Sequence, residues 1–247
     1  MFYRIWCWIA VACVAATWCA SVGAAEGGER YPLVQGKPFI FVVHDGKSVK
    51  VQRKQDPNYQ LEGYFARTVR ECPPFCLQPE HVAPGVETIG EVELFDFMEN
   101  DLRDGTGILI DARTPSWHGR GTIPGSVNYP FTLFAKDADN AKVDEILKSF
   151  GAKPRGEVPW WEQKAEEWGL RDSTEKTAKW DFTLAKTLVL FCNGPECGQS
   201  PRAIRGLLAQ GYPAAKLKYY RGGMQVWLLW GLTTVTPGGH DAESVTP

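Results

Sequence analysis

Hydrophobic and polar residues alternate in two short runs near the start of the chain. Residues 38–44 (PFIFVVH) and 47–53 (KSVKVQR) are rich in β-branched and aromatic residues, and Asp45-Gly46 joins them. An Asp-Gly pair between two such runs predicts a β-hairpin. Residues 55–85 show no periodicity and contain five prolines, which predicts an extended arm.

From residue 89 onward the pattern changes to alternating helices and strands. Amphipathic or helix-like segments are expected at 89–102, 141–149, 161–168, 201–210 and 223–230. Nearly continuous apolar runs predict buried strands at 107–112, 187–192 and 217–220. Strands that alternate with helices favour right-handed parallel crossovers. The chain is therefore expected to have an α/β fold, a parallel sheet flanked by helices, with the hairpin and arm as an N-terminal elaboration.

One predicted helix follows a strand that ends in cysteine. We expect Ser200 to be the N-cap of this helix and Pro201 its first residue. Gly211 is well placed to end it. A helix N-terminus directly after Cys192 would present free N–H groups to an anion.

The first 25 residues differ from the rest of the chain. Arg4 is their only charge, and an apolar stretch leads to the small residues Val22-Gly23-Ala24-Ala25. This is the pattern of a secretory signal peptide, although residues 5–25 would also suit an uncleaved membrane anchor. We expect a periplasmic or secreted protein without membrane attachment after cleavage. The expected organisation is a signal peptide at 1–25, the hairpin and arm at 26–86, the α/β domain at 87–237 and a flexible tail at 238–247.

Composition limits the classes of partner. The chain has 247 residues, 44% of them hydrophobic and 23% charged, and a net charge of −2. These values are ordinary for a globular domain, and no Lys/Arg run is present, so a nucleic-acid partner is not expected. No pattern in the sequence predicts a cofactor.

Cysteine usage agrees with export. Three of the seven cysteines, Cys7, Cys13 and Cys19, lie in the predicted signal peptide. The remaining four form two close pairs, Cys72 with Cys76 and Cys192 with Cys197. An even number in an exported chain favours disulfides, and four cysteines allow three pairings among which the sequence does not choose. Zinc held by all four thiolates is disfavoured because neither pair has CxxC spacing, so no metal site is predicted.

Cys192 is the candidate nucleophile. A thiol attacks only as thiolate, and the expected loop and helix N-terminus would stabilise a thiolate, a persulfide or a bound oxyanion. The residues expected to form this anion cradle are Asn193, Gly194, Pro195, Glu196, Gly198, Gln199 and Ser200. Cys197 has three open roles: a resolving thiol, a second sulfur acceptor or a lock on the loop. The alternative for Cys192 is an inert thiol or one half of a structural disulfide.

Two motifs in this region resemble the rhodanese-like (sulfurtransferase) family. The first is LVLFC-NGPEC-GQS-PRAIRGLLAQGY followed by YYRGGMQVWLLWGL, and the second is LIDARTPSWHGRGTIPGSVNYP. Together they cover about residues 87–237. The positions that match the second family motif are Asp111, Arg113, Ile123, Pro124, Gly125, Asn128 and Pro130. The CxxxxC-Gly-Gln-Ser loop is similar to an exported subgroup, some of whose relatives are associated with quinoprotein-linked alcohol catabolism.

The resemblance implies a sulfurtransferase that forms a persulfide on Cys192. Sulfane sulfur from a small donor such as thiosulfate or a persulfide would pass to a thiol or another small nucleophile. Asp111 and Arg113 would contact the residues of the active loop and not the substrate itself. The alternative is a non-catalytic or redox-switchable module that binds a periplasmic partner and contains a Cys192–Cys197 disulfide.

The loop departs from the family pattern. Glu196 and a second cysteine replace a shorter loop with a basic residue, and Thr122 stands where His is common. An acidic loop is expected to bind thiosulfate less well. A phosphatase-type or arsenate-reductase-type site requires Cys-x5-Arg, but Gly198 lies six residues after Cys192 and Ala203 lies six after Cys197. His118 and Arg120 are expected in a solvated loop.

Overall fold

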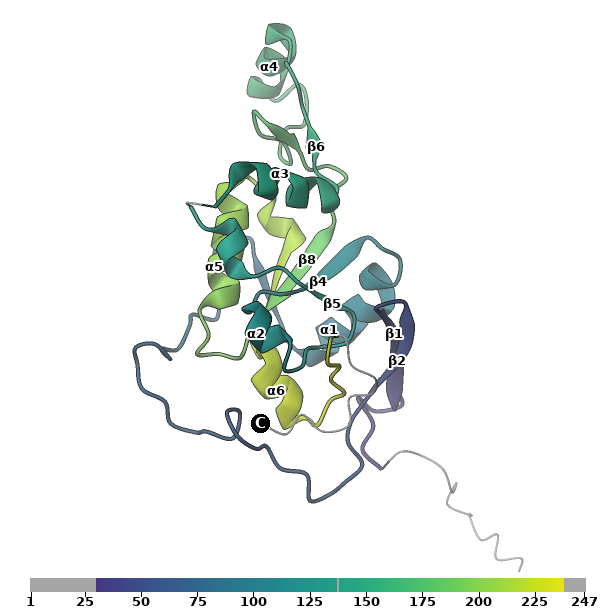
Figure 1. Ribbon diagram of the computed structural model, residues 1–247. Coiled ribbons are helices and arrows are strands. Elements are labelled where there is room, and N and C mark those ends of the chain that lie inside the picture. Colours follow the sequence, from purple (N-terminus) through teal and green to yellow (C-terminus); the bar gives the residue numbers. More distant parts are fainter. Residues whose placement is uncertain (1–29, 137, 238–247) are drawn as a thin grey trace, which may run out of the picture.

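The computed structural model describes residues 30–136 and 138–237 (Figure 1). The predicted signal peptide and C-terminal tail lie outside these residues, as do Cys7, Cys13 and Cys19. Across the described ranges, no helix has both the length and the apolar character needed to span a membrane.

A five-stranded parallel sheet forms the centre of the protein, as predicted. Its spatial order is β3-β9-β8-β4-β5. The strands are β3 (Glu87–Ile89), β4 (Gly107–Asp111), β5 (Ser126–Asn128), β8 (Thr187–Phe191) and β9 (Leu217–Tyr220). Because β8 is the middle strand, the residue that follows it lies at the centre of the carboxyl edge, where open α/β sheets bind ligands.

Both faces of the sheet are covered, which explains the continuous apolar runs of the central strands. One face packs against α3 (Asn140–Ser149), α5 (Gln199–Ala209) and the 3-10 turn η2 (Phe131–Phe134). The other packs against α1 (Glu91–Phe97), its π-helical continuation η1 (Met98–Leu102), α6 (Gly223–Leu229) and the N-terminal hairpin. Two further short helices, α2 (Pro115–His118) and η3 (Ala214–Lys216), lie in connecting loops.

The hairpin and the arm are confirmed. Strands β1 (Phe39–His44) and β2 (Lys47–Gln52) pair antiparallel, and the turn residues Asp45 and Gly46 have φ of 48° and 75°. Positive φ at both positions suits a tight hairpin turn. The chain from 54 to 86 then runs without helix or strand around the carboxyl edge of the sheet (Figure 1).

Two local predictions are wrong. Helix α5 begins at Gln199 with Gly198 as N-cap, so Ser200 is not the cap and Pro201 is the third helical residue. The reason is that Arg202 N–H already bonds to the Gly198 carbonyl at 3.1 Å, whereas the Ser200 hydroxyl is used elsewhere. The amphipathic pattern of residues 89–102 also places Val92 on the apolar side of this helix together with Phe95, but in α1 the Val92 side chain is 50% exposed.

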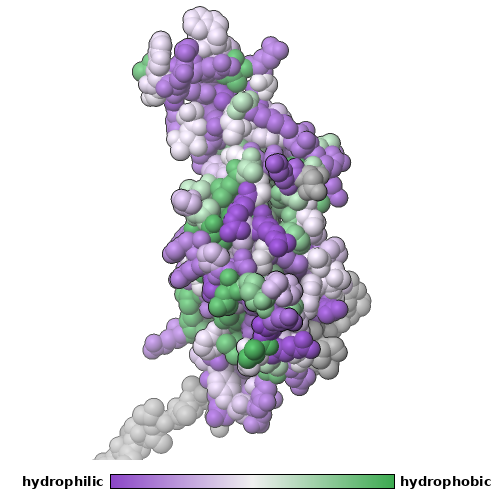
Figure 2. All heavy atoms as spheres, turned by 90° about the vertical axis from the view of Figure 1, so that its left-hand side faces the viewer, coloured by the Kyte–Doolittle hydropathy of each residue, from purple (hydrophilic) through white to green (hydrophobic). Residues whose placement is uncertain are grey.

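The segment between α3 and β8 projects away from the sheet (Figure 1). It contains β6 (Lys153–Pro154), α4 (Trp160–Glu167) and β7 (Trp180–Asp181). Trp180 anchors this segment in the core, but no residue of α4 is buried. Figure 2 shows the side of α5 and the arm, where the surface is mostly hydrophilic with small separate hydrophobic areas.

Candidate active site

The loop between β8 and α5 carries the two free cysteines. Cys192 directly follows the central strand and is 2% exposed, whereas Cys197 near the other end of the loop is partly exposed. The residues predicted to form the cradle all lie here, with Asn193, Gly194, Pro195, Glu196 and Gly198 in the loop and Gln199 and Ser200 at the start of α5. Sequence and structure therefore place the candidate chemistry in one loop.

The sulfur of Cys192 points into this loop. The Ser200 hydroxyl donates a hydrogen bond to Cys192 Sγ at 3.0 Å, and Cys192 Sγ donates to the Cys197 carbonyl oxygen at 3.1 Å. Burial raises the pKa of the Cys192 thiol well above its ordinary value, and hydrogen bonding to Cys197 raises it further. At rest, Cys192 therefore holds its proton.

The pKa of Cys197 shifts in the opposite direction to that of Cys192. The hydrogen bond from Cys192 lowers the pKa of the Cys197 thiol, and backbone N–H groups of Gln199 and Asn193 add to this effect against the opposing effect of burial. Gln199 is the first residue of α5, so the helix N-terminus contributes as expected, but to the second cysteine. Of the two thiols, Cys197 is therefore the one that loses its proton more readily.

Asp111 and Arg113 support the loop from behind, where the sequence places them. Arg113 binds the Asp111 carboxylate through Nε at 2.9 Å and Nη2 at 2.7 Å, and both side chains are buried. Its Nη1 donates to Asn193 Oδ1 at 3.3 Å. This arginine therefore connects the end of β4 to the residue after Cys192.

His118 belongs to the same network, contrary to the expectation of a solvated loop. Its Nδ1 lies 2.9 Å from Asp111 Oδ2, and the side chain is 15% exposed. Burial by itself raises the pKa of Asp111, but hydrogen bonds from His118 and Arg113 outweigh it, so the pKa is lowered. Thr122 also donates to Asp111 Oδ2 at 2.9 Å, which gives a role to the residue that stands where His is common.

The start of α6 packs directly on the loop. Met224 N–H donates to the Cys192 carbonyl at 3.0 Å, and Gln225 N–H donates to the Asn193 carbonyl at 2.8 Å. Gly223 has a φ of 55°, and a Cβ at this position would lie 2.3 Å from the Cys192 carbonyl oxygen. Only glycine fits here, which explains the Gly222-Gly223 pair before the helix.

The N-terminal arm crosses the outer side of the loop. Gln78 N–H donates to the Pro195 carbonyl at 2.8 Å, and Arg221 Nη2 donates to the Gln78 carbonyl at 3.0 Å. Arg70 forms an ion pair with Glu196, and its guanidinium lies 4.0 Å from the ring centroid of Tyr64. The sequence provides no signal for the contacts of Gln78 with Pro195 and Arg221 or of Arg70 with Glu196, because each joins positions more than 100 residues apart.

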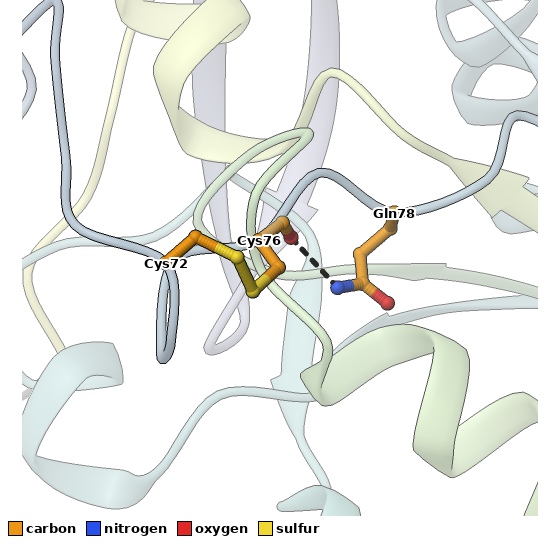
Figure 3. The surroundings of a disulfide bond; sticks show 3 residues. All are labelled: Cys72, Cys76 and Gln78. Carbon is orange, nitrogen blue, oxygen red and sulfur yellow. Dashed lines mark hydrogen bonds between the residues drawn. A yellow bond between two sulfur atoms is a disulfide. The ribbon is translucent and has the colours of Figure 1, made fainter.

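A disulfide joins Cys72 and Cys76 within the arm (Figure 3). The Gln78 side chain donates to the Cys76 carbonyl at 2.8 Å beside it. The sequence left three pairings of the four cysteines open. The structure contains the Cys72–Cys76 disulfide, while Cys192 and Cys197 in the active loop are free thiols. In the disulfide form, Cys72 and Cys76 offer no thiolate to a metal. In the described ranges, no three His, Cys, Asp or Glu side chains gather as a metal site.

Three buried donors near the loop have no hydrogen-bond partner among the described residues. They are Arg70 Nε, Arg221 Nε and the Tyr219 hydroxyl. Burial raises the pKa of Tyr219, and an ionised Cys192 would raise it further, which places the hydroxyl within electrostatic reach of the thiol.

Comparison with known proteins identifies the family. Residues 95–229 match the family model described as the rhodanese-like domain, a span that includes Cys192 and more than half of the chain. The chain belongs to the rhodanese-like family. The two motifs that suggested this family both lie within or beside the matched residues of the rhodanese-like domain.

Several solved structures are similar in fold to this rhodanese-like chain. The human single-domain sulfurtransferase is 19% identical, with 58% of this chain and 96% of that chain covered and a TM-score of 0.33. A rhodanese-related protein from Thermoplasma volcanium is 14% identical, with coverage of 61% and 98% and a TM-score of 0.32. The As-Sb reductase from Leishmania major is 17% identical, with coverage of 59% and 79% and a TM-score of 0.36. None of the curated proteins matches the chain in sequence.

Proposed function

We propose that this protein is an exported rhodanese-like sulfurtransferase that forms a persulfide on Cys192. The observation that carries the proposal is the pair of free thiols in the loop after β8, where the Ser200 hydroxyl donates to Cys192 Sγ and Cys192 Sγ donates to the Cys197 carbonyl oxygen. Export rests on the signal-peptide pattern of residues 1–25. The subgroup associated with quinoprotein-linked catabolism rests on the CxxxxC-Gly-Gln-Ser loop.

The first step loads sulfur. Cys192 passes its proton to the Cys197 thiolate, and the Cys192 sulfur attacks the sulfane sulfur of the donor. The donor S–S bond breaks, and sulfite or a thiolate leaves with the bonding electron pair. The product is a Cys192 persulfide, stabilised by the hydroxyl and the backbone N–H of Ser200.

The second step delivers sulfur. An acceptor thiolate attacks the outer sulfur of the persulfide, the S–S bond to Cys192 breaks, and the acceptor leaves as a persulfide. Cys192 takes back its proton from Cys197, and no external oxidant or reductant is consumed.

The structure favours a small anionic donor. Arg70 offsets the charge of Glu196, and Arg221 holds a second guanidinium against Gln78 of the arm, which itself bonds to Pro195 of the loop. The buried Arg70 Nε, Arg221 Nε and Tyr219 hydroxyl have no partner among the described residues, and they would donate to oxygen or sulfur atoms of a thiosulfate-like or persulfide anion once the arm moves aside. The arm thus compensates for the acidic loop that the sequence contains.

Sulfur transfer to a small thiol tests the proposal. The mature chain would be mixed with thiosulfate, glutathione persulfide or polysulfide in separate reactions, and persulfide formed on the acceptor thiol would be trapped and measured. Cys192→Ser is expected to reduce the rate at least about 100-fold. Transfer that continues unchanged in Cys192→Ser would overturn the assignment.

One observation favours the second candidate, a redox-switchable binding module for a periplasmic partner. Cys192 is 2% exposed beneath the arm, and an oxidised Cys192–Cys197 pair would be inert to donors. A mature chain that keeps this disulfide under mild reductant and takes up no sulfur would support the module.

A further inference from the structure

The position of Cys197 beside Cys192 suits a thiol that attacks Cys192 as well as one that accepts its proton. The hydrogen bond from Cys197 N–H to the Gly194 carbonyl, at 2.9 Å, closes a tight turn that folds the loop back on itself. As a result, Cys197 lies against Cys192, although five positions separate them. A thiolate held beside the atom that receives the sulfur is the arrangement of a resolving thiol.

We propose that Cys197 resolves the Cys192 persulfide and releases hydrosulfide, so that the protein also acts as a sulfane-sulfur reductase. This inference rests on the proposed function, because it requires a persulfide on Cys192. It adds a different product, sulfide in place of a persulfidated acceptor, and a dithiol reductant as co-substrate.

The reaction balances as a thiol–disulfide exchange. Cys197, which took up the Cys192 proton during loading, passes this proton to the outer sulfur of the persulfide. The resulting Cys197 thiolate attacks the Cys192 Sγ and forms the Cys192–Cys197 disulfide. The bond between Cys192 Sγ and the outer sulfur breaks, and the outer sulfur leaves with the electron pair and one proton as HS⁻. The sulfane sulfur is reduced by two electrons, and the two cysteines are oxidised by two. A dithiol reductant then reduces the disulfide and restores both thiols.

The arm favours this internal route over attack by a large external thiol. Gln78 bonds to Pro195 and Arg70 pairs with Glu196 across the outside of the loop, and Cys192 beneath them is almost fully buried. An external thiol must reach the buried persulfide, whereas Cys197 is held beside it at high effective concentration.

Arg70 also offsets the negative charge that would make Cys197 harder to deprotonate. Glu196 is the neighbour of Cys197, and its charge raises the pKa of that thiol. The ion pair with Arg70 offsets this charge, and the arginine and glutamate side chains are only 8% and 12% exposed. The arm therefore supports the resolving thiol as well as covering it.

A single-turnover experiment with the mature chain tests the inference. The reduced protein, free of reductant, would receive one equivalent of glutathione persulfide or inorganic polysulfide, and released sulfide would be measured with intact mass. The wild type is expected to release about one sulfide per chain and to become about 2 Da lighter, with the new disulfide mapped to Cys192 and Cys197. Cys197→Ser is expected to retain the extra sulfur and to release sulfide at least about tenfold more slowly.

The outcomes separate the two claims. If the wild type keeps its persulfide and releases no sulfide until an external thiol is added, the resolving role is wrong while the sulfurtransferase proposal stands. If neither wild type nor Cys197→Ser takes up sulfur, the sulfurtransferase proposal is wrong and the inference fails with it. Uptake by Cys197→Ser also shows that this variant is folded.

Discussion

Arg70 of the N-terminal arm and Glu196 of the active loop form an ion pair in which both side chains are about nine-tenths buried. This pair joins segments 126 residues apart and brings a cation to a loop that has none of its own. It makes the arm a part of the active site. Removal of one partner from a buried ion pair leaves an uncompensated charge, which is costly.

Arg70→Gln is expected to release the arm from the loop. Without Arg70, the Glu196 carboxylate is hydrated only when the arm moves away from the loop. The free energy of this local opening should therefore fall by about 1.4 kcal/mol or more, which raises the equilibrium constant for opening about tenfold. Chymotrypsin cleavage at Tyr64 and Phe65 measures this opening. Arg67→Gln is the matched control, because it removes the same charge from an exposed position of the arm. Equal cleavage of both variants would contradict the role of the ion pair.

The two thiols should differ in their dependence on pH. The lowered pKa of Cys197 means that its thiolate persists below the ordinary pH range of a thiol, whereas Cys192 stays protonated because its pKa is raised. Iodoacetamide should therefore modify Cys197 first. As the pH is lowered, the rate of this modification should begin to fall at a lower pH than for an ordinary thiol. Cys192→Ala removes the donor and should raise the pKa of Cys197. Alkylation rates from about pH 5 to 10, resolved by peptide, measure both effects. Preferential labelling of Cys192 would contradict the assignment.

Gly223→Ala should destabilise the protein by about 3 kcal/mol. The new Cβ would lie 2.3 Å from the Cys192 carbonyl oxygen, and the residue would keep a φ of 55°. Gly105→Ala is the control, because Gly105 has a φ of 73° but no atom within 4 Å of its Cβ position. It should cost about 1 kcal/mol. Urea unfolding measures both, and similar losses in the two variants would show that the close contact is not important.

Asp111 should make the protein sensitive to acid. Its pKa is lowered in the folded state, so its contribution to stability is fully present above the unfolded value of about 3.9. The contribution is lost as the pH falls through the lower folded pKa. Asp111→Asn should be less stable than wild type at neutral pH but lose less stability below about pH 4. Urea unfolding at several pH values tests this, and parallel pH profiles would contradict it.

The alternation of helices and strands could be predicted because local sequence determines it. Asp45-Gly46 specified the hairpin, and the apolar runs that end at Asp111 and Cys192 specified two adjacent strands of the sheet. The resemblance to the rhodanese-like family implied that Asp111 and Arg113 support the loop, and the pairing of β4 with β8 brings them close to it. The family match over residues 95–229 agrees with this reading.

Other features depend on contacts that local sequence does not encode. Arg70 reaches Glu196 only because the arm folds across the sheet edge, and irregular segments have no periodicity from which to predict such a path. The proton distribution between Cys192 and Cys197 depends on burial and on which sulfur the N–H groups meet. Ser200, expected as a helix cap, instead donates to Cys192 because α5 begins at Gln199.

The location of the transferred sulfur shows whether Cys192 carries the persulfide. We would incubate the Cys197→Ser chain, in which internal resolution is blocked, with polysulfide and measure its intact and peptide masses beside those of Cys192→Ser. A Cys192 persulfide should add about 32 Da to the peptide that contains Cys192, and Cys192→Ser should show no gain. A gain in Cys192→Ser, or no gain in either chain, would contradict a persulfide on Cys192.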